Sequence, residues 1–173
     1  MVTGLKSQSS TVAIGFSVTE TGANTFTQGS VDLNLDPLSN EVFVVQAINL
    51  NITPPDGLAG LNTSVSAALT TTSQLTAGAV PTLALSNCLA RVDSQIRGAG
   101  YVDSGVGFTN ASLETPPSDL AYIGIIATND FFLQVEGFQN AGVKALTGKL
   151  YGYRARADSS IYAALVQSEV LSA

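Results

Sequence analysis

Apolar residues recur at every second position in several separate segments of this chain. The clearest segment is 11–20, where small and polar residues separate a row of apolar side chains, Val12, Ile14, Phe16 and Val18. A period of two is the pattern of a β-strand that buries one face. A chain made of such segments has to pair them into sheets, because an isolated strand leaves its backbone polar groups unsatisfied.

Alternation, or a short apolar run between turn residues, predicts further strands at 31–36, 41–52, 82–85, 89–96, 120–127, 131–138 and 144–157. The segment 41–52 is the longest. Its alternation predicts one shared face for Val42, Val44, Gln46, Ile48, Leu50 and Ile52, while Phe43 and Val45 make its first half apolar on both sides. The nearly continuous apolar run 120–127 predicts a strand buried on both faces.

Two segments have ambiguous patterns. The segment 58–74 is rich in small and hydroxyl residues and fits either a polar strand or a long loop. In 161–171, the Ala and Leu content allows a helix, but Ile161, Tyr162, Val166 and Val170 favour a strand, which is the structure we expect there. The chain then has nine or ten short strands and no convincing helix.

Short strands spaced by turn signals predict an all-β protein, either an antiparallel sandwich, a jelly roll or a barrel. The length of 173 residues suits one domain, with a short N-terminal extension of about ten residues before the first alternating segment. Crossover helices between the expected strands are absent from the pattern. This argues against a parallel α/β sheet and the cofactor site at its switch point.

Only 12% of the residues are charged, so Ser, Thr, Asn, Gln and Gly have to supply most of the polar surface. Such a surface is poorly protected against association. The net charge of −6, without any Lys/Arg run, argues against direct nucleic-acid binding. No apolar run approaches the roughly 20 residues of a membrane-spanning helix.

The residues that usually carry catalysis are scarce. The chain has no His, which excludes Ser-His and Cys-His pairs. Its one cysteine, Cys88, excludes an internal disulfide and is expected to be a buried apolar residue, with a reactive thiol as the alternative. Two carboxylates could act as in glycosidases, and the candidate pairs are Asp130 with Glu136 and Asp93 with Asp103. We expect no enzyme activity and no cofactor.

Asp32, Asn34 and Asp36 have the D-x-N-x-D spacing that opens a calcium-binding loop, but Pro37 stands where an EF-hand needs Gly. The alternation instead places the three side chains on the solvated face of a strand, and a weak calcium site is the alternative. Three Asn-x-Ser/Thr triplets begin at Asn51, Asn62 and Asn110. In a chain rich in these residues we expect them to be unused.

The segment 151–156 contains two of the five tyrosines and two arginines. In a strand, Tyr151 and Tyr153 share one face, and Arg154 and Arg156 share the other. Tyr and Arg are the residue types that anchor protein interfaces, so these four form a candidate subunit interface. The alternative is a strand whose tyrosines pack on the core and whose arginines pair with surface carboxylates.

The chain as a whole resembles the single jelly-roll major capsid proteins of icosahedral viruses. The resemblance lies in its low charge, its lack of His and Trp, its Ser/Thr/Asn/Gly-rich surface and the order of its strands, above all in 120–171, LAYIGIIATNDFFLQVEGFQNAGVKALTGKLYGYRARADSSIYAALVQSEVL. It implies a single jelly roll of about 8–10 strands that assembles with copies of itself into a shell, in a virion made in the host cytoplasm.

Many such proteins carry a basic N-terminal arm, whereas this chain begins MVTGLKSQSSTVAIGF. In this respect it is similar to the upright single jelly rolls of membrane-containing double-stranded DNA viruses of bacteria and archaea. That similarity implies an internal membrane beneath the shell and allows a second capsid protein. The alternatives are another virion component, such as a spike, decoration or tail-tube subunit, and a carbohydrate-binding module, against which the lack of Trp counts.

Overall fold

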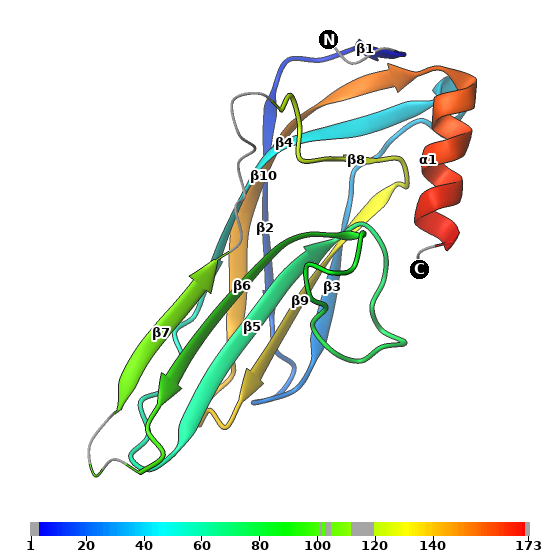
Figure 1. Cartoon of the computed structure of the whole chain (residues 1–173). Coiled ribbons are helices and arrows are strands. Elements are labelled where there is room, and N and C mark those ends of the chain that lie inside the picture. Colours follow the sequence, from blue (N-terminus) through cyan, green and yellow to red (C-terminus); the bar gives the residue numbers. More distant parts are fainter. Residues whose placement is uncertain (1–3, 101, 103–104, 112–119, 172–173) are drawn as a thin grey trace.

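The computed structural model describes residues 4–100, 102, 105–111 and 120–171. It is a sandwich of two antiparallel sheets with one helix at the C-terminus (Figure 1). Sheet A contains β1 (Leu5–Ser7), β2 (Val12–Thr19), β4 (Glu41–Ile52), β8 (Gly124–Ile126) and β10 (Ala145–Ala157). Sheet B contains β3 (Thr27–Asp32), β5 (Asn62–Thr70), β6 (Cys88–Arg97), β7 (Val106–Ala111) and β9 (Asp130–Phe138). The all-β antiparallel sandwich predicted from alternation is confirmed.

The strand order is that of a jelly roll. Strands β2, β10, β4 and β8 lie side by side in sheet A, and β3, β9, β5 and β6 lie side by side in sheet B. When these eight strands are renumbered along the chain, the orders become 1-8-3-6 and 2-7-4-5, the double Greek key of a single jelly roll. Strand β1 pairs with the end of β10, and β7 adds an edge strand next to β6.

The main core lies between the sheets, where the inward rows of both pack together. Phe16 of β2 meets Phe131 of β9 edge to face, with ring centroids 5.8 Å apart. A second cluster lies on the outer side of sheet A, beneath helix α1 (Ser159–Leu171). From the helix it receives Ile161, Tyr162, Leu165 and Val166, which form one stripe at helical spacing.

The strand expected at 161–171 is therefore wrong, as is the expectation of no helix. Ile161 and Leu165, like Tyr162 and Val166, are four residues apart, so a helix places all four against sheet A. The helix begins just after β10, where the Asp158 carbonyl accepts a hydrogen bond from the Tyr162 amide at 2.8 Å. Burial of this stripe outweighs the strand preference of its β-branched and aromatic residues.

The predicted single face for the alternating residues of 41–52 is also wrong. Tyr151 of β10 is opposite Ala47, but the next residue, Gly152, is opposite Val45, so Gln46 is an extra residue, a β-bulge. The bulge reverses the alternation. Val42 and Val44 consequently pack under α1, while Ile48, Leu50 and Ile52 face the sandwich core with Phe43 and Val45.

Smaller differences occur elsewhere. The segment 58–74 contains β5, so the polar-strand alternative is correct there. The segment 82–85 is a turn instead of a strand, with the Leu85 amide bonded to the Thr82 carbonyl at 3.1 Å. In 120–127 only Gly124–Ile126 is a strand, although it does pack on both sides, through Ile126 to the main core and Ile125 to the second cluster.

The two ends of the molecule differ, and we name them by their contents. The helix end contains β1, α1 and the start of β4; the loop end contains the connections 20–26, 53–61 and 139–144 (Figure 1). No helix in the described part of the chain is long and apolar enough to cross a membrane.

Candidate functional site

The four residues of the candidate interface lie on β10, towards the helix end. Tyr153 packs against the second cluster. Arg154, on the other face of the strand, donates hydrogen bonds to the Leu33 carbonyl at 2.7 Å and the Asn34 carbonyl at 2.9 Å, and its Nη1 lies 3.2 Å from Glu41 Oε2. Tyr153 and Arg154 therefore have intramolecular roles, as the alternative interpretation of this segment predicts.

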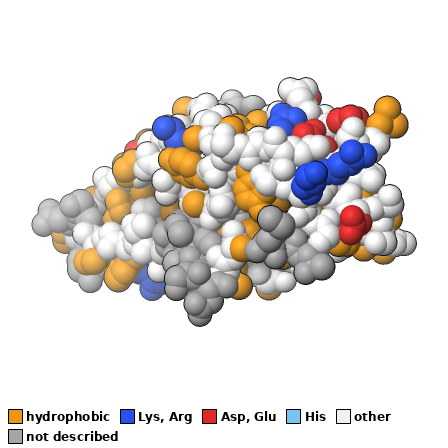
Figure 2. Space-filling view, turned by 90° about the horizontal axis from the view of Figure 1, so that it is seen from above, with side chains coloured by type: hydrophobic (Ala, Val, Ile, Leu, Met, Phe, Trp, Pro, Cys, Tyr) orange, Lys and Arg blue, Asp and Glu red, His pale blue; other side chains and the backbone are white. Residues whose placement is uncertain are grey.

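Arg156 is exposed and has two register partners, Lys6 of β1 on one side and Glu41 of β4 on the other. Like charges at such opposed positions destabilise a sheet unless other groups compensate them. Neither side chain forms an ion pair within the described residues, although Arg156 contributes to the electrostatic environment of Asp36. Both line a groove of about 400 Å³ together with Asp158. In the view from above in Figure 2, basic and acidic side chains gather side by side towards one end of the molecule.

Tyr151 lies on the outer face of sheet A, which is nearly uncharged. The residues in register on this face are small or neutral: Ala13, Gly15 and Ser17 from β2, Thr147 from β10, and Ala47, Asn49 and Asn51 from β4. Among the described residues in register on this face, Lys149 is the one that carries a charge. The lining of a groove of about 630 Å³ includes Gly15, Gly148 and Tyr151. The face exposes sheet backbone between small side chains.

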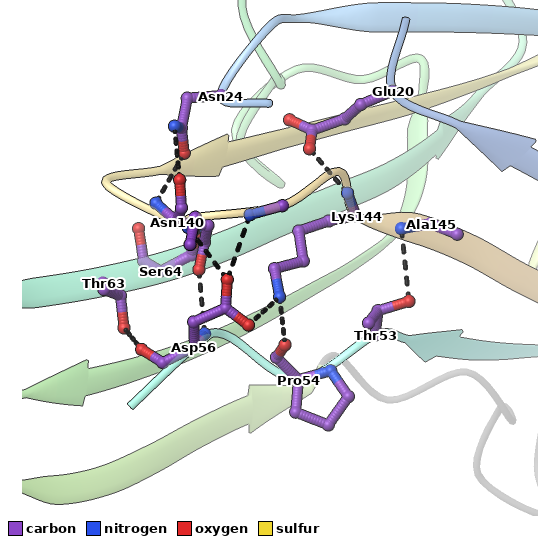
Figure 3. Close-up of polar contacts among 12 residues, drawn as sticks. Glu20, Asn24, Thr53, Pro54, Asp56, Thr63, Ser64, Asn140, Lys144 and Ala145 are labelled. Atoms are coloured by element: carbon purple, nitrogen blue, oxygen red, sulfur yellow. Dashed lines mark hydrogen bonds and ion pairs between the residues drawn. The ribbon is translucent and has the colours of Figure 1, made fainter. Parts of the chain in front are cut away.

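The loop end contains a buried polar network that links three connections (Figure 3). Glu20, which follows β2, accepts hydrogen bonds from the Gly137 amide at 2.6 Å and the Lys144 amide at 2.7 Å. Asn140 accepts a hydrogen bond from the Asp56 amide at 3.0 Å and donates one to the Ser64 carbonyl at 2.8 Å. These bonds hold the connections in one arrangement, because each buried polar group needs its partner.

Lys144 and Asp56 form the ion pair of this network, with Nζ 2.7 Å from Oδ1. The lysine is only 4% exposed, and its ammonium also donates to the Pro54 carbonyl at 2.9 Å. The hydrogen bond from Lys144 lowers the pKa of Asp56, and amides of the 139–144 connection lower it further. With its ammonium held between two acceptors, Lys144 acts as an internal cation that fixes the loops, and it is poorly placed to attack a substrate.

Helix α1 carries one charged residue, Glu169, and this residue is buried. Its Oε1 accepts the Ala127 amide at 3.0 Å and its Oε2 accepts the Thr128 amide at 2.9 Å. Burial raises the pKa of Glu169, and the hydrogen bonds from Ala127 and Thr128 only partly offset this effect. The carboxylate anchors the end of α1 to the connection between β8 and β9.

Of the carboxylate pairs considered for catalysis, the one that the structure describes in full, Asp130 with Glu136, is not assembled. Asp130 and Glu136 lie six residues apart on the same strand, which is about 20 Å, too far to flank one glycosidic bond. Asp93 is held by Arg91 and Ser66, and Asp103 lies outside the described residues. Within the described chain, no group of three or more His, Cys, Asp or Glu side chains could hold a metal ion.

The Asp32-Asn34-Asp36 segment is solvated, as predicted, but it is not one strand. Strand β3 ends at Asp32, whose Oδ1 accepts the Asn34 amide at 2.7 Å, and Asn34 has a left-handed φ of 51°. Asp36 caps a short 3-10 helix, Pro37–Ser39, and the hydrogen bond from Ser39 lowers its pKa. The two carboxylates thus serve separate turns.

Cys88 is buried, as predicted, and burial raises the pKa of its thiol, which disfavours the reactive thiolate. The sequence analysis missed Glu20, Lys144 and Glu169. For Glu169 there was a signal, since it is the one charge in an otherwise neutral segment, 159–171. For Glu20 and Lys144 no local pattern exists, because they are 124 residues apart.

No protein-family model matches this chain, and no curated protein matches it. Among solved structures, one of Desmodium yellow mottle tymovirus has 10% identity, covers 87% of this chain and 91% of its own, and has a TM-score of 0.31. The unassembled VP1 pentamer of KI polyomavirus has 9% identity, with coverages of 78% and 75% and a TM-score of 0.38. VP1 of Merkel cell polyomavirus has 8% identity, with coverages of 90% and 97% and a TM-score of 0.38. At this level of similarity, none of these structures assigns a function to the chain.

Proposed function

We propose that this protein is a viral structural protein whose copies self-assemble, through sheet-edge and loop contacts, into an icosahedral capsid shell. One observation carries the proposal: the outer face of sheet A and the exposed side of α1 are almost uncharged. In the described part of the chain, Lys149 is the one charge on the former, and the one charge of α1, Glu169, is buried.

A shell subunit has to bury large, repeated surfaces against its neighbours. Removing charged groups from water is costly, whereas a face of Gly, Ala, Ser, Thr and Asn loses little on desolvation and can pack closely. A jelly roll is an architecture used for viral capsid domains, and its strand order is present here. The buried loop-end network supports the same function, because fixed loops present one shape to every neighbour.

Within this proposal, Tyr151 and Arg156 contact a neighbouring subunit, and Tyr153 and Arg154 hold the strand that presents them. Lys6 and Arg156 form an opposed basic pair, which suits an acidic segment of another copy. The protein then resides in the virion, after synthesis in the host cytoplasm. An internal membrane and a second capsid protein remain further parts of the proposal, and the neutral exposed side of α1 is compatible with either neighbour.

Light scattering of the purified protein, with negative-stain electron microscopy of the same sample, tests the proposal. We expect pentamers, rings or closed shells. A chain that stays monomeric at high concentration, both alone and with phospholipid vesicles, contradicts self-assembly.

A charge-reversal variant tests the proposed contact. Arg156→Glu should shift the scattering mass towards the monomer while leaving the thermal unfolding midpoint nearly unchanged, because Arg156 is exposed. Arg97→Glu is the matched control, since Arg97 is also exposed but lies at the other end, on sheet B. If both variants assemble like the wild type, the placement of Arg156 at an interface is wrong.

A further inference from the structure

The outer face of sheet B carries a polar surface that no role described above uses. Four strands bring residues into register across it: Phe138 of β9 is opposite Ser64 of β5, Ser64 is opposite Gln95 of β6, and Gln95 is opposite Phe108 of β7. The next row contains Glu136, Ser66, Asp93 and Asn110. We call these two rows the sheet B platform. A hollow of about 250 Å³ lies over it, lined by Ser64, Ser66, Arg91, Asp93, Gln95 and Asn110.

The acceptor at the centre of the platform is held rigidly. Asp93 accepts two hydrogen bonds from Arg91, from Nε at 2.7 Å and Nη2 at 2.9 Å, and one from Ser66 Oγ at 2.5 Å. Arg91 is itself fixed by the Val80 and Pro81 carbonyls, at 3.1 and 2.6 Å. Burial raises the pKa of Asp93, but these hydrogen bonds outweigh burial and hold it below its ordinary value. The carboxylate therefore stays ionised and oriented.

Groups beside Asp93 are open to a ligand. Within the described residues, the side-chain amides of Gln95 and Asn110 form no hydrogen bond, so each offers both a donor and an acceptor. Phe108 and Phe138 are 49% and 56% exposed, which is unusual for Phe on a sheet face. They lie three strand spacings apart, about 14 Å, at the two ends of the first row.

We propose that the sheet B platform binds a neutral oligosaccharide. Sugar rings combine a rim of hydroxyls, which pair with carboxylates and amides, with C–H faces that pack on aromatic rings. Asp93, Gln95 and Asn110 supply the first kind of contact. Phe138 supplies the second, together with the face of the Phe108 ring opposite the Arg97 guanidinium, which lies 5.8 Å from the ring centroid. The charges on and beside the platform balance, because Arg91 pairs with Asp93 and Arg97 and Glu136 have opposite signs. A neutral ligand fits this balance better than an anionic one.

A protein partner would use the face differently. Protein interfaces have fully buried centres, with apolar or aromatic anchors in pockets. Here the centre of the platform is polar and the aromatic rings lie at its margins, with a shallow hollow between them. This arrangement favours a flat polyhydroxyl ligand.

Titration calorimetry with cellotetraose, maltotetraose, laminaritetraose and chitotetraose tests the proposal, with 3′-sialyllactose as an anionic probe. We expect at least one neutral tetrasaccharide to bind with a Kd of about 1 mM or tighter. Gln95→Ala and Asn110→Ala should each weaken that binding by about tenfold, the effect of losing a hydrogen bond. Asn49→Ala and Asn51→Ala remove the same kind of side chain from the outer face of sheet A and should leave binding unchanged.

The proposal is overturned if none of the neutral tetrasaccharides binds, if sialyllactose binds more tightly than all of them, or if the sheet A controls lose binding as much as the platform variants. It is also overturned if cross-linking shows the platform covered by a second copy of the chain. The proposed assembly is tested separately, through Arg156 at the helix end, so either proposal can fail without the other.

Discussion

The two ends of sheet A differ in how many of their faces are buried. At the helix end, β4 buries both faces, with Phe43 and Val45 towards sheet B and Val42 and Val44 beneath α1. At the loop end, the same strand buries only one face and exposes Asn49 on the other. One inserted residue, Gln46, separates the half of β4 that is buried on both faces from the half that is buried on one. A single bulge thus lets one strand serve two cores, because it reverses which residues face each side.

Buried charges at the two ends also differ. At the loop end, the buried ammonium of Lys144 has a carboxylate partner, Asp56. At the helix end, the Glu169 carboxylate accepts hydrogen bonds from two backbone amides, and no cation among the described residues pairs with it. A countercharge lowers the pKa of Asp56, whereas burial without one raises the pKa of Glu169. The pKa shifts of these two carboxylates therefore have opposite signs.

Deletion of Gln46 should have the largest effect on stability. Without the bulge, either the helix-end half or the loop-end half of β4 presents the wrong face to its core. Phe43 would have to fit against the small residues Ala155 and Ala157. We expect a loss of about 4 kcal/mol or more in the free energy of unfolding, measured by urea denaturation.

Gln46→Ala is the matched control, because it keeps the extra residue. It removes only the hydrogen bond that Thr11 Oγ1 donates to Gln46 Oε1 at 2.8 Å, so we expect a loss of about 1 kcal/mol or less. If the deletion costs no more than the substitution, the bulge does not determine which faces are buried.

Glu20→Ala should have the next largest effect. It leaves the buried amides of Gly137 and Lys144 without their acceptor, at a cost of about 3 kcal/mol in the free energy of unfolding. Glu136→Ala, which removes a carboxylate from the surface of β9, should cost about 0.5 kcal/mol or less in the same urea titration. Equal losses in the two variants would show that the loop-end network does not stabilise the fold.

Glu169 should produce the smallest effect, visible as a pH dependence. Its pKa in the folded state lies above its ordinary value of 4.5, so between these two values the folded state binds a proton that the unfolded state does not. The contribution of Glu169 to the free energy of unfolding should therefore rise as the pH falls through this window, and stay constant below 4.5. Urea denaturation at a series of pH values measures it.

Glu169→Gln should remove that rise, because the amide does not titrate. The contribution of Asp56, at the loop end, should change with pH in the opposite direction. The pKa of Asp56 lies below its ordinary value of 3.8, so its contribution is present above 3.8 and is lost as the pH falls further, towards the folded-state pKa. A wild-type profile without the rise above 4.5, or a variant that keeps it, contradicts the assignment to Glu169.

Alternation located most of the strands, because the period of a half-buried strand is visible within a few residues. The predicted 41–52 coincides with β4, and 11–20 and 144–157 enclose β2 and β10. Alternation did not predict the structure of the segment that packs on the outer side of sheet A. In 161–171 the β-branched residues suggested a strand, but a helix placed the same residues against the outer face of sheet A.

The candidate site was predicted less completely. The sequence placed Tyr151 and Tyr153 on one face and Arg154 and Arg156 on the other, which holds because β10 has no extra residue of its own between them. It could not assign Arg154 to carbonyls more than 100 residues away. The sheet B platform was also out of reach, since its rows depend on the register of four strands.

The sequence by itself thus determined the all-β class, the position of most strands and the nearly uncharged surface, all of which follow from local periodicity and composition. Tertiary structure alone decided the strand order, the bulge at Gln46, the helical fold of 159–171 and the pairing of Glu20 and Asp56 with the Lys144 region. These features depend on contacts between residues far apart in the chain. Burial there selects among conformations that the local sequence leaves nearly equal in free energy.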